Sequence, residues 1–77
     1  MNKQRRREIS KVMQALDEIH TSISDIWGEE EESYDNLPDS IRYSERGDAH
    51  ENAIDALQSA MGSIEEASDY LEAAQEQ

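Results

Sequence analysis

The sequence predicts an all-α protein: a long antiparallel helical hairpin, similar to a coiled coil, that dimerises into a four-helix bundle or binds a partner along its seam. Two observations favour this fold. Apolar residues in each half of the chain recur at steps of three, four and seven, and the only proline lies between the two halves. A stripe with a seven-residue period requires a partner helix along its whole length. We expect residues 1–77 to form one domain.

The first helix is predicted over residues 3–36. If its apolar residues are written as heptads, the a positions hold Ile9, Leu16 and Ile23, the d positions hold Val12, Ile19 and Ile26, and the e positions include Met13 and Trp27. Tyr34 and Leu37 continue the pattern beyond Gly28. One glycine costs a helix about 1 kcal/mol. We therefore expect the helix to pass through Gly28, with a kink or fraying there as the alternative.

The connection is predicted over residues 37–47. Leu37 precedes Pro38, which disfavours the α conformation at Leu37 and ends the first helix. Pro38 can open a short helical turn over residues 38–44. Gly47 suits a bend before the next helix.

The second helix is predicted over residues 48–74, because Asp48 followed by Glu51 resembles a capping box. Leu57, Ile64 and Leu71 repeat at seven. An alanine column repeats at seven between them, and it consists of Ala53, Ala60, Ala67 and Ala74. Small residues allow a neighbouring helix to approach closely, with large residues of the first helix filling the space.

The two helices are expected to pair so that residue i lies near residue 84 − i, which places Trp27 near Leu57 and Met13 near Leu71. Charge favours the antiparallel direction. Residues 1–11 carry a net charge of +4 and residues 12–77 a net charge of −16. Folding back places the basic start beside the acidic residues 65–76, and the acidic residues 29–32 beside Arg42, Arg46 and His50.

Length and composition predict self-association. A chain of 77 residues with 35% hydrophobic residues has little material for a core, and with no cysteine it has no disulfide to compensate. A dimer is therefore expected. No signal-peptide h-region and no apolar run of membrane-spanning length occurs, so the sequence predicts a cytoplasmic protein without membrane contact. The net charge of −12 disfavours direct nucleic-acid binding and favours a basic protein partner.

No motif predicts catalysis, a cofactor or a metal site. His20 and His50 are expected to lie far apart along the hairpin. The acidic residues around Asp35, Asp39 and Glu45 do not fit a calcium loop, because Pro38 stands where a ligand is needed. The carboxylates have no predicted pocket in which acid–base chemistry would operate. We therefore interpret the protein as non-enzymatic.

Rows of acidic residues on the helices are the candidate partner-binding surface, since carboxylates on a rigid rod can imitate a phosphate backbone. The alternative is a solvated face that only confers solubility. The candidate acidic residues are Glu29, Glu30, Glu31, Glu32, Asp48, Glu51, Asp55, Glu65, Asp69 and Glu72. Three aromatic residues near the bend, Trp27, Tyr34 and Tyr43, are candidates for a binding hot spot. For Trp27 and Tyr34 the alternative is packing at the end of the core.

Three segments carry a resemblance to a known group: Asp35-Asn36-Leu37-Pro38-Asp39-Ser40, Ser44-Glu45-Arg46-Gly47 and Ala53-Ile54-Asp55-Ala56-Leu57. With them, most of the chain resembles the short acidic helical accessory proteins encoded by bacterial viruses and prophages. The resemblance implies a phage-encoded inhibitor of a host defence or nucleic-acid-handling protein, acting in the host cytoplasm. It carries no functional residues. The alternative function is a self-assembling coiled-coil scaffold.

Overall fold

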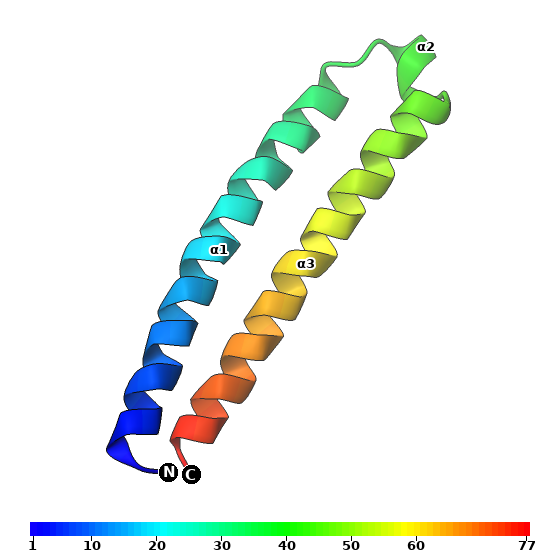
Figure 1. The fold of residues 1–77 in the computed structure, drawn as a ribbon. Coiled ribbons are helices and arrows are strands. Elements are labelled where there is room, and N and C mark those ends of the chain that lie inside the picture. Colours follow the sequence, from blue (N-terminus) through cyan, green and yellow to red (C-terminus); the bar gives the residue numbers. More distant parts are fainter.

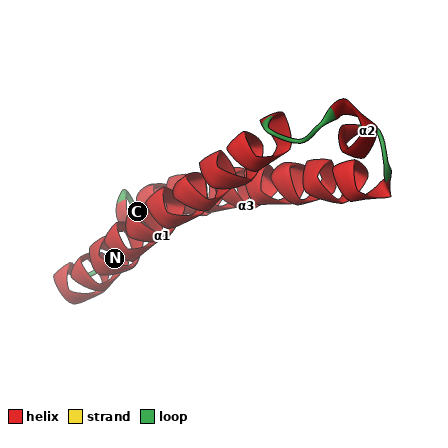
Figure 2. Cartoon of the chain, turned by 90° about the horizontal axis from the view of Figure 1, so that it is seen from above, coloured by secondary structure: helices red, strands yellow, loops and turns green.

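A computed structural model describes all 77 residues, and it shows two long helices folded back on each other. Helix α1 spans Lys3–Asp35, the short helix α2 spans Asp39–Arg42, and helix α3 spans Glu45–Gln75. The molecule is a rod of 58 × 15 × 11 Å with both chain ends at one extremity and α2 at the other (Figure 1). Seen from above, α1 and α3 cross at a shallow angle (Figure 2). The predicted all-helical fold with two long packed helices is confirmed.

Helix α1 begins where Asn2 caps it, with the Asn2 side-chain oxygen accepting a hydrogen bond of 2.8 Å from the Arg5 backbone N–H. It continues through Gly28 without interruption. The predicted extension beyond this glycine is therefore confirmed, and the helix does not end or fray there. It ends at Asp35, one residue before the predicted boundary, with Asn36 as the C-cap.

Gly28 also provides a stability prediction. A Cβ added at Gly28 would meet no atom within 4 Å. We therefore expect Gly28→Ala to raise the free energy of unfolding by about 0.5–1 kcal/mol, because alanine loses less conformational freedom in a helix. Chemical denaturation monitored by circular dichroism measures this change, and a destabilised variant would contradict it.

Helix α3 begins at Glu45 rather than at the predicted Asp48, with Ser44 in the N-cap position. The proposed capping box is therefore wrong: both Asp48 and its partner Glu51 lie within the helix. Gly47 is not a bend residue but part of the first turn of α3, and it is the one buried residue of the chain. It is buried because the backbone carbonyl of Arg42 lies directly against it.

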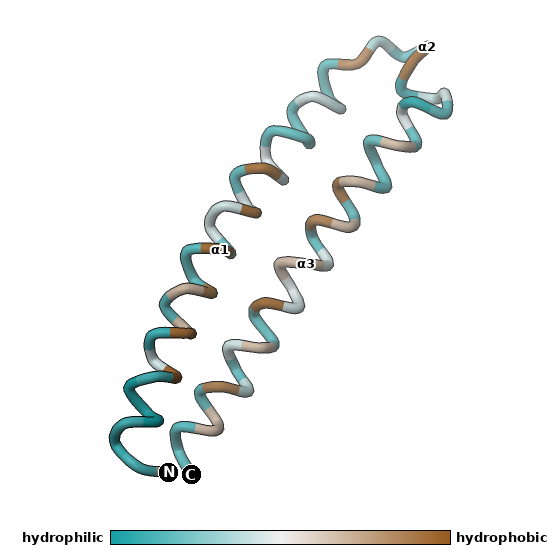
Figure 3. Tube along the Cα trace, in the orientation of Figure 1, coloured by the Kyte–Doolittle hydropathy of each residue, from teal (hydrophilic) through white to brown (hydrophobic).

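The seam between α1 and α3 consists of half-buried residues that face each other across the hairpin (Figure 3). On α1 these are Ile9, Met13, Leu16, His20, Ile23, Trp27 and Tyr34, and on α3 they are Ile54, Leu57, Met61, Ile64 and Leu71. These are a and e positions. The d positions were expected in the seam, but Val12, Ile19 and Ile26 remain 50%, 47% and 49% exposed.

The physical reason is that one neighbouring helix covers one stripe only. Three residues advance a helix by about 300°, so the d position lies about 60° to one side of the a position, while the e position lies about 40° to the other. Helix α3 contacts the a and e side. The alanine column is displaced in the same way: Ala60, Ala67 and Ala74 lie at the edge of the seam, and Ala53 is exposed.

Candidate protein-binding surface

The half of the rod that contains the bend is strongly acidic. Residues 20–58 hold eleven acidic and two basic residues, whereas the remaining residues, at the open end, hold eight acidic and five basic ones. The outward positions of α1 and α3 carry most of these carboxylates. The bend half is therefore the more negative part of the molecule by a wide margin.

Tyr34 joins the two helices near the bend. Its hydroxyl donates a hydrogen bond of 2.8 Å to Oε1 of Glu51. This bond to Glu51, followed by desolvation and by the Glu51 charge, raises the pKa of the Tyr34 phenol above its ordinary value of 10.0. Tyr34 is half-buried, so it contributes to packing at this end of the rod while its hydroxyl remains at the surface.

Arg42 fastens the connection to α1. Its Nη2 donates to the backbone carbonyl of Asp35 at 2.8 Å and to that of Leu37 at 3.4 Å, and its guanidinium lies 5.6 Å from the centre of the Tyr34 ring. Because the last carbonyls of a helix lack internal partners, this arginine satisfies the C-terminal end of α1. Arg42, one of the two cations of the bend half, is thus held at the connection, where its Nη1 also lies 3.8 Å from Oδ1 of Asp39.

His50 faces Glu30 across the seam, with Nδ1 of His50 3.2 Å from Oε2 of Glu30. This contact is not a hydrogen bond, and Nδ1 of His50 is buried without a hydrogen-bond partner. The contact becomes an ion pair only when His50 is protonated. The expected proximity of Glu30 to His50 is confirmed.

A shallow, open depression lies on this half of the rod, between α1 and α3. Tyr34 and Ile54 are among the residues that line it. Carboxylates surround it, and these are Glu31, Asp35, Glu51 and Asp55. The fold thus brings together three of the predicted acidic residues, Glu31, Glu51 and Asp55, with the predicted aromatic residue Tyr34. Such a surface can accept several hydrogen bonds from lysine or arginine side chains.

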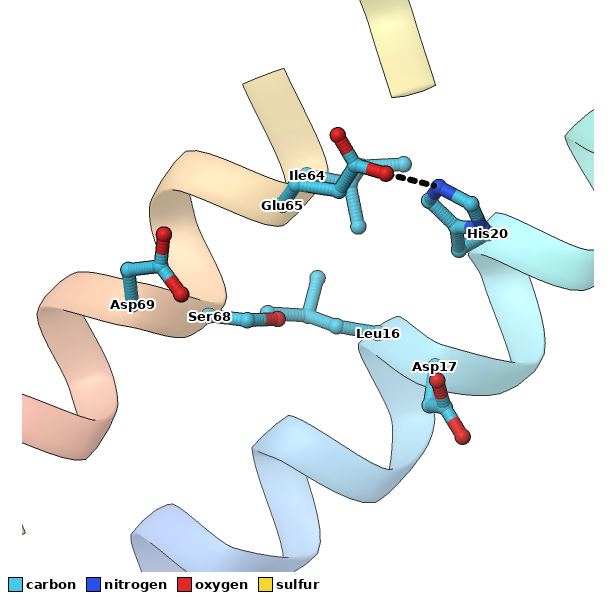
Figure 4. Close-up of a pocket in the computed structure, with 7 residues that line it drawn as sticks. All are labelled: Leu16, Asp17, His20, Ile64, Glu65, Ser68 and Asp69. Carbon is cyan, nitrogen blue, oxygen red and sulfur yellow. Dashed lines mark hydrogen bonds and ion pairs between the residues drawn. The ribbon is translucent and has the colours of Figure 1, made fainter. Parts of the chain in front are cut away.

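A second depression lies midway along the rod (Figure 4). Leu16 and Ile64 point toward each other across the seam, and Nε2 of His20 lies 3.1 Å from Oε1 of Glu65. Asp69 also lines this depression, so two of the predicted acidic residues, Glu65 and Asp69, lie at the same site. The contact between His20 and Glu65 was not predicted; the spacing of the two residues in the antiparallel register could have indicated it.

The other candidate residues are dispersed. Glu29, Glu32, Asp48 and Glu72 are exposed, and Glu72 lies toward the open end, far from the rest. Trp27 is half-buried in the seam, with its Nε1 buried and without a hydrogen-bond partner, so it packs between the helices as one of the two alternatives predicted. Tyr43, which follows α2, is 81% exposed and is available to a partner.

The open end differs from expectation. The basic residues of the N-terminal run were expected to contact the acidic residues 65–76, but none of Lys3, Arg5, Arg6, Arg7 or Lys11 makes an ion pair with a carboxylate. The side-chain contacts between the helices here join neutral groups. Nε2 of Gln75 donates to the backbone carbonyl of Arg6 at 3.0 Å and to the hydroxyl of Ser10 at 2.6 Å. The five cationic side chains of this run are all exposed.

The chemistry available on this surface is ion pairing and hydrogen bonding. No group of three or more His, Asp or Glu side chains is arranged to hold a metal ion. No helix has the length and apolar character needed to cross a membrane.

The fold and surface define a helical hairpin with an acidic bend half. No protein-family model matches the chain, and comparisons with curated proteins and with solved structures give no significant match. The resemblance to acidic phage accessory proteins therefore stays a prediction.

The Tyr34–Glu51 bond gives a testable titration. We expect the phenol of Tyr34 to ionise at a higher pH than 10.0, and Glu51→Gln to bring it back toward that value, because the largest cause of the shift is the Glu51 hydrogen bond. A pKa raised in the folded state adds stability below the unfolded pKa, and this stability is lost as pH rises through the folded pKa. Ultraviolet difference titration against Tyr34→Phe isolates the signal. Glu31→Gln is the matched control, and an equal effect of both glutamine variants would contradict the assignment.

Proposed function

We propose that the chain is a non-enzymatic protein-binding module that docks on a basic protein surface through its acidic bend half. The observation that carries the proposal is the segregation of charge: eleven acidic residues against two basic ones in residues 20–58, with Arg42 engaged by backbone carbonyls. A rigid rod of this kind presents carboxylates at fixed spacing, so binding does not require ordering the surface first.

The partner class follows from the charge. Proteins that handle nucleic acids gain affinity from lysine and arginine side chains that replace counterions on phosphates. An acidic rod that occupies the same channel competes for these side chains without contacting nucleic acid itself. A phage-encoded inhibitor of a host defence or nucleic-acid-handling protein, acting in the host cytoplasm, is the form of this proposal that the sequence resemblance favours.

The test starts from capture of basic proteins by the tagged chain from a bacterial lysate, followed by titration with the purified partner. We expect affinity to fall steeply with salt, as counterion-linked binding does. Replacing the four glutamates 29–32 by glutamine should weaken binding by at least about tenfold, since several rim charges are lost together. The matched control replaces Glu65, Glu66, Glu72 and Glu76 by glutamine, which removes the same charge from the open end. Binding that is indifferent to salt and to the first variant would refute the proposal.

The second candidate function is a self-assembling scaffold. It is favoured by a separate observation, the half-exposed Val12, Ile19 and Ile26 on α1. A chain that acts only as a scaffold would self-associate and would capture no basic protein from the lysate.

A further inference from the structure

The two broad sides of the hairpin differ in chemistry. On one side, hydrogen bonds cross from α1 to α3 between His20 and Glu65, between Tyr34 and Glu51, and between Ser10 and Gln75. Both shallow depressions lie on this polar side. On the other side no side-chain hydrogen bond crosses between the helices.

That other side, here the apolar face, carries six residues, each three places after a seam residue: Val12, Ile19, Ile26, Ala60, Ala67 and Ala74. Three residues turn a helix by about 300°, and reversing the helix direction reverses the sense of that turn. Equal offsets on two antiparallel helices therefore fall on the same side of the pair. The stripe of α1, which consists of Val12, Ile19 and Ile26, and the alanine column of α3 therefore form one continuous face.

In the single hairpin, both the apolar face and the seam between the two helices remain partly exposed to solvent. No hydrophobic residue of the chain is fully buried. The accessible surface is 5758 Å², whereas a compact monomer of 8.8 kDa is expected to expose roughly 4,800 Å². The surplus of about 1,000 Å² is close to the roughly 800 Å² that each partner buries in a typical stable interface.

We propose that the apolar face packs against the same face of a second copy, reversed end for end, about a twofold axis that passes beside Ile19. This inference does not rest on the proposed binding function, although the second copy and a basic partner would compete for the glutamates 29–32. Val12 and Ile26 are equally distant from Ile19 in the sequence, so the reversed copy brings Val12 of one chain to Ile26 of the other and Ile19 to Ile19. Ala15 and Ser22 alternate with these residues on α1 and allow the two helices to approach closely.

Charge identifies the occupant as another copy of this chain. With the axis at Ile19, residues 3–11 of one chain lie along residues 27–35 of the other. The first segment holds five basic residues and one acidic residue, and the second holds five acidic residues and no basic one. The basic side chains have no ion-pair partner within their own chain, so they are free to meet these carboxylates. Arg5 lies seven residues before Val12 and Glu29 three residues after Ile26, so both border the apolar face, about one helical turn apart along the axis of the dimer.

The other symmetric arrangement places both bends at the same end, with the stripe of α1 over the alanine column of the second copy. It fits large residues to small ones, but it stacks the two bend halves, each with eleven acidic and two basic residues, on each other. It also leaves both basic N-terminal runs together. Because both charge clusters repel in this arrangement and attract in the reversed one, the reversed dimer is favoured.

The first measurement is the mass of the purified full chain by light scattering or sedimentation at micromolar concentration. We expect twice the 8.8 kDa chain mass. Ile19→Asp should yield a monomer at the same concentration, whereas the control Gln14→Asp, at an exposed position outside the face and the seam, should remain a dimer. A wild-type monomer, or a dimer unaffected by Ile19→Asp, would overturn the proposal.

The second measurement changes only residues that are exposed in the single chain and leaves the apolar face intact. Arg5→Glu should raise the dimer dissociation constant by about tenfold, because two symmetric attractions become repulsions, and adding Glu29→Arg should restore it. The single variant Glu29→Arg is measured as well. If the double variant raises the dissociation constant by the product of the two single-variant factors, Arg5 does not meet Glu29 of the second copy and the reversed arrangement is wrong.

The third measurement fixes the orientation directly. The chain has no cysteine, so Ser40→Cys at the exposed bend accepts one spin label per chain. In the reversed dimer the two labels lie apart by a distance near the 58 Å length of the rod, whereas bends at one end would bring them within about two rod widths of 15 Å. Pulsed electron spin resonance distinguishes the two distances, and the short one would refute the reversed dimer.

Discussion

Replacing Leu16 with aspartate is expected to abolish the cooperative unfolding of the hairpin. Leu16 is half-buried in the middle of the seam and lies toward Ile64 (Figure 4). A carboxylate there must either lose solvent or separate the helices, and no lysine or arginine lines the depression at this level of the rod. Such substitutions cost about 3 kcal/mol or more, a large fraction of the stability of a chain with no fully buried apolar residue.

Thermal melting followed by circular dichroism measures this effect. Ile64→Asp, on the opposite side of the seam, should behave in the same way. Gln14→Asp adds the same side chain to the exposed surface of α1 and should change the melting temperature little. Cooperative melting retained in both seam variants near the wild-type temperature would show that the seam is wrongly assigned.

The hairpin itself could be predicted from the sequence because its determinants are local and periodic. The heptads of Leu16, Ile23, Leu57 and Ile64 specify two long helices, and Pro38 separates them. The antiparallel register follows from the short connection, and the contacts of Tyr34 with Glu51 and of His20 with Glu65 agree with it to within one residue. Continuation through Gly28 was also predictable, since one glycine costs less than a long apolar stripe gains.

The side of each stripe that faces the partner helix could not be predicted. Positions d and e both flank position a, and apolar residues occupy both on α1: Ile19 at d, and Met13 and Trp27 at e. A single neighbour covers one flank. The flank chosen is the one where α3 supplies Met61 and Ile54 rather than alanine, so larger apolar surfaces meet. The d flank is then left for a second layer.

The candidate binding surface was predictable in its acidity and not in its contacts. The glutamates 29–32 are local in sequence, but Glu51 and Asp55 join Glu31 and Tyr34 only because the chain folds back. The role of Arg42 at the end of α1 depends on the path of the connection, which residue periodicity does not specify.

Gly47→Ala is expected to destabilise the protein by roughly 3 kcal/mol, through overpacking at the turn from α2 to α3. A Cβ built on Gly47 would overlap the backbone carbonyl of Arg42, which cannot move aside as a flexible side chain would. Alanine gains about 1 kcal/mol of helix propensity over glycine, which is less than the cost of this overlap. The overlap therefore decides the sign of the effect.

The matched control is Gly62→Ala in the same helix, where an added Cβ meets no atom within 4 Å and helix propensity alone should act. Denaturant unfolding of the two variants should thus move in opposite directions from wild type. The damage at Gly47 should also release Arg42 from the carbonyls of Asp35 and Leu37, since α2 must shift to admit the methyl group. If the two alanine variants were equally stable, Gly47 would not pack against the Arg42 carbonyl. The start of α3 would then be the predicted Asp48 rather than Glu45.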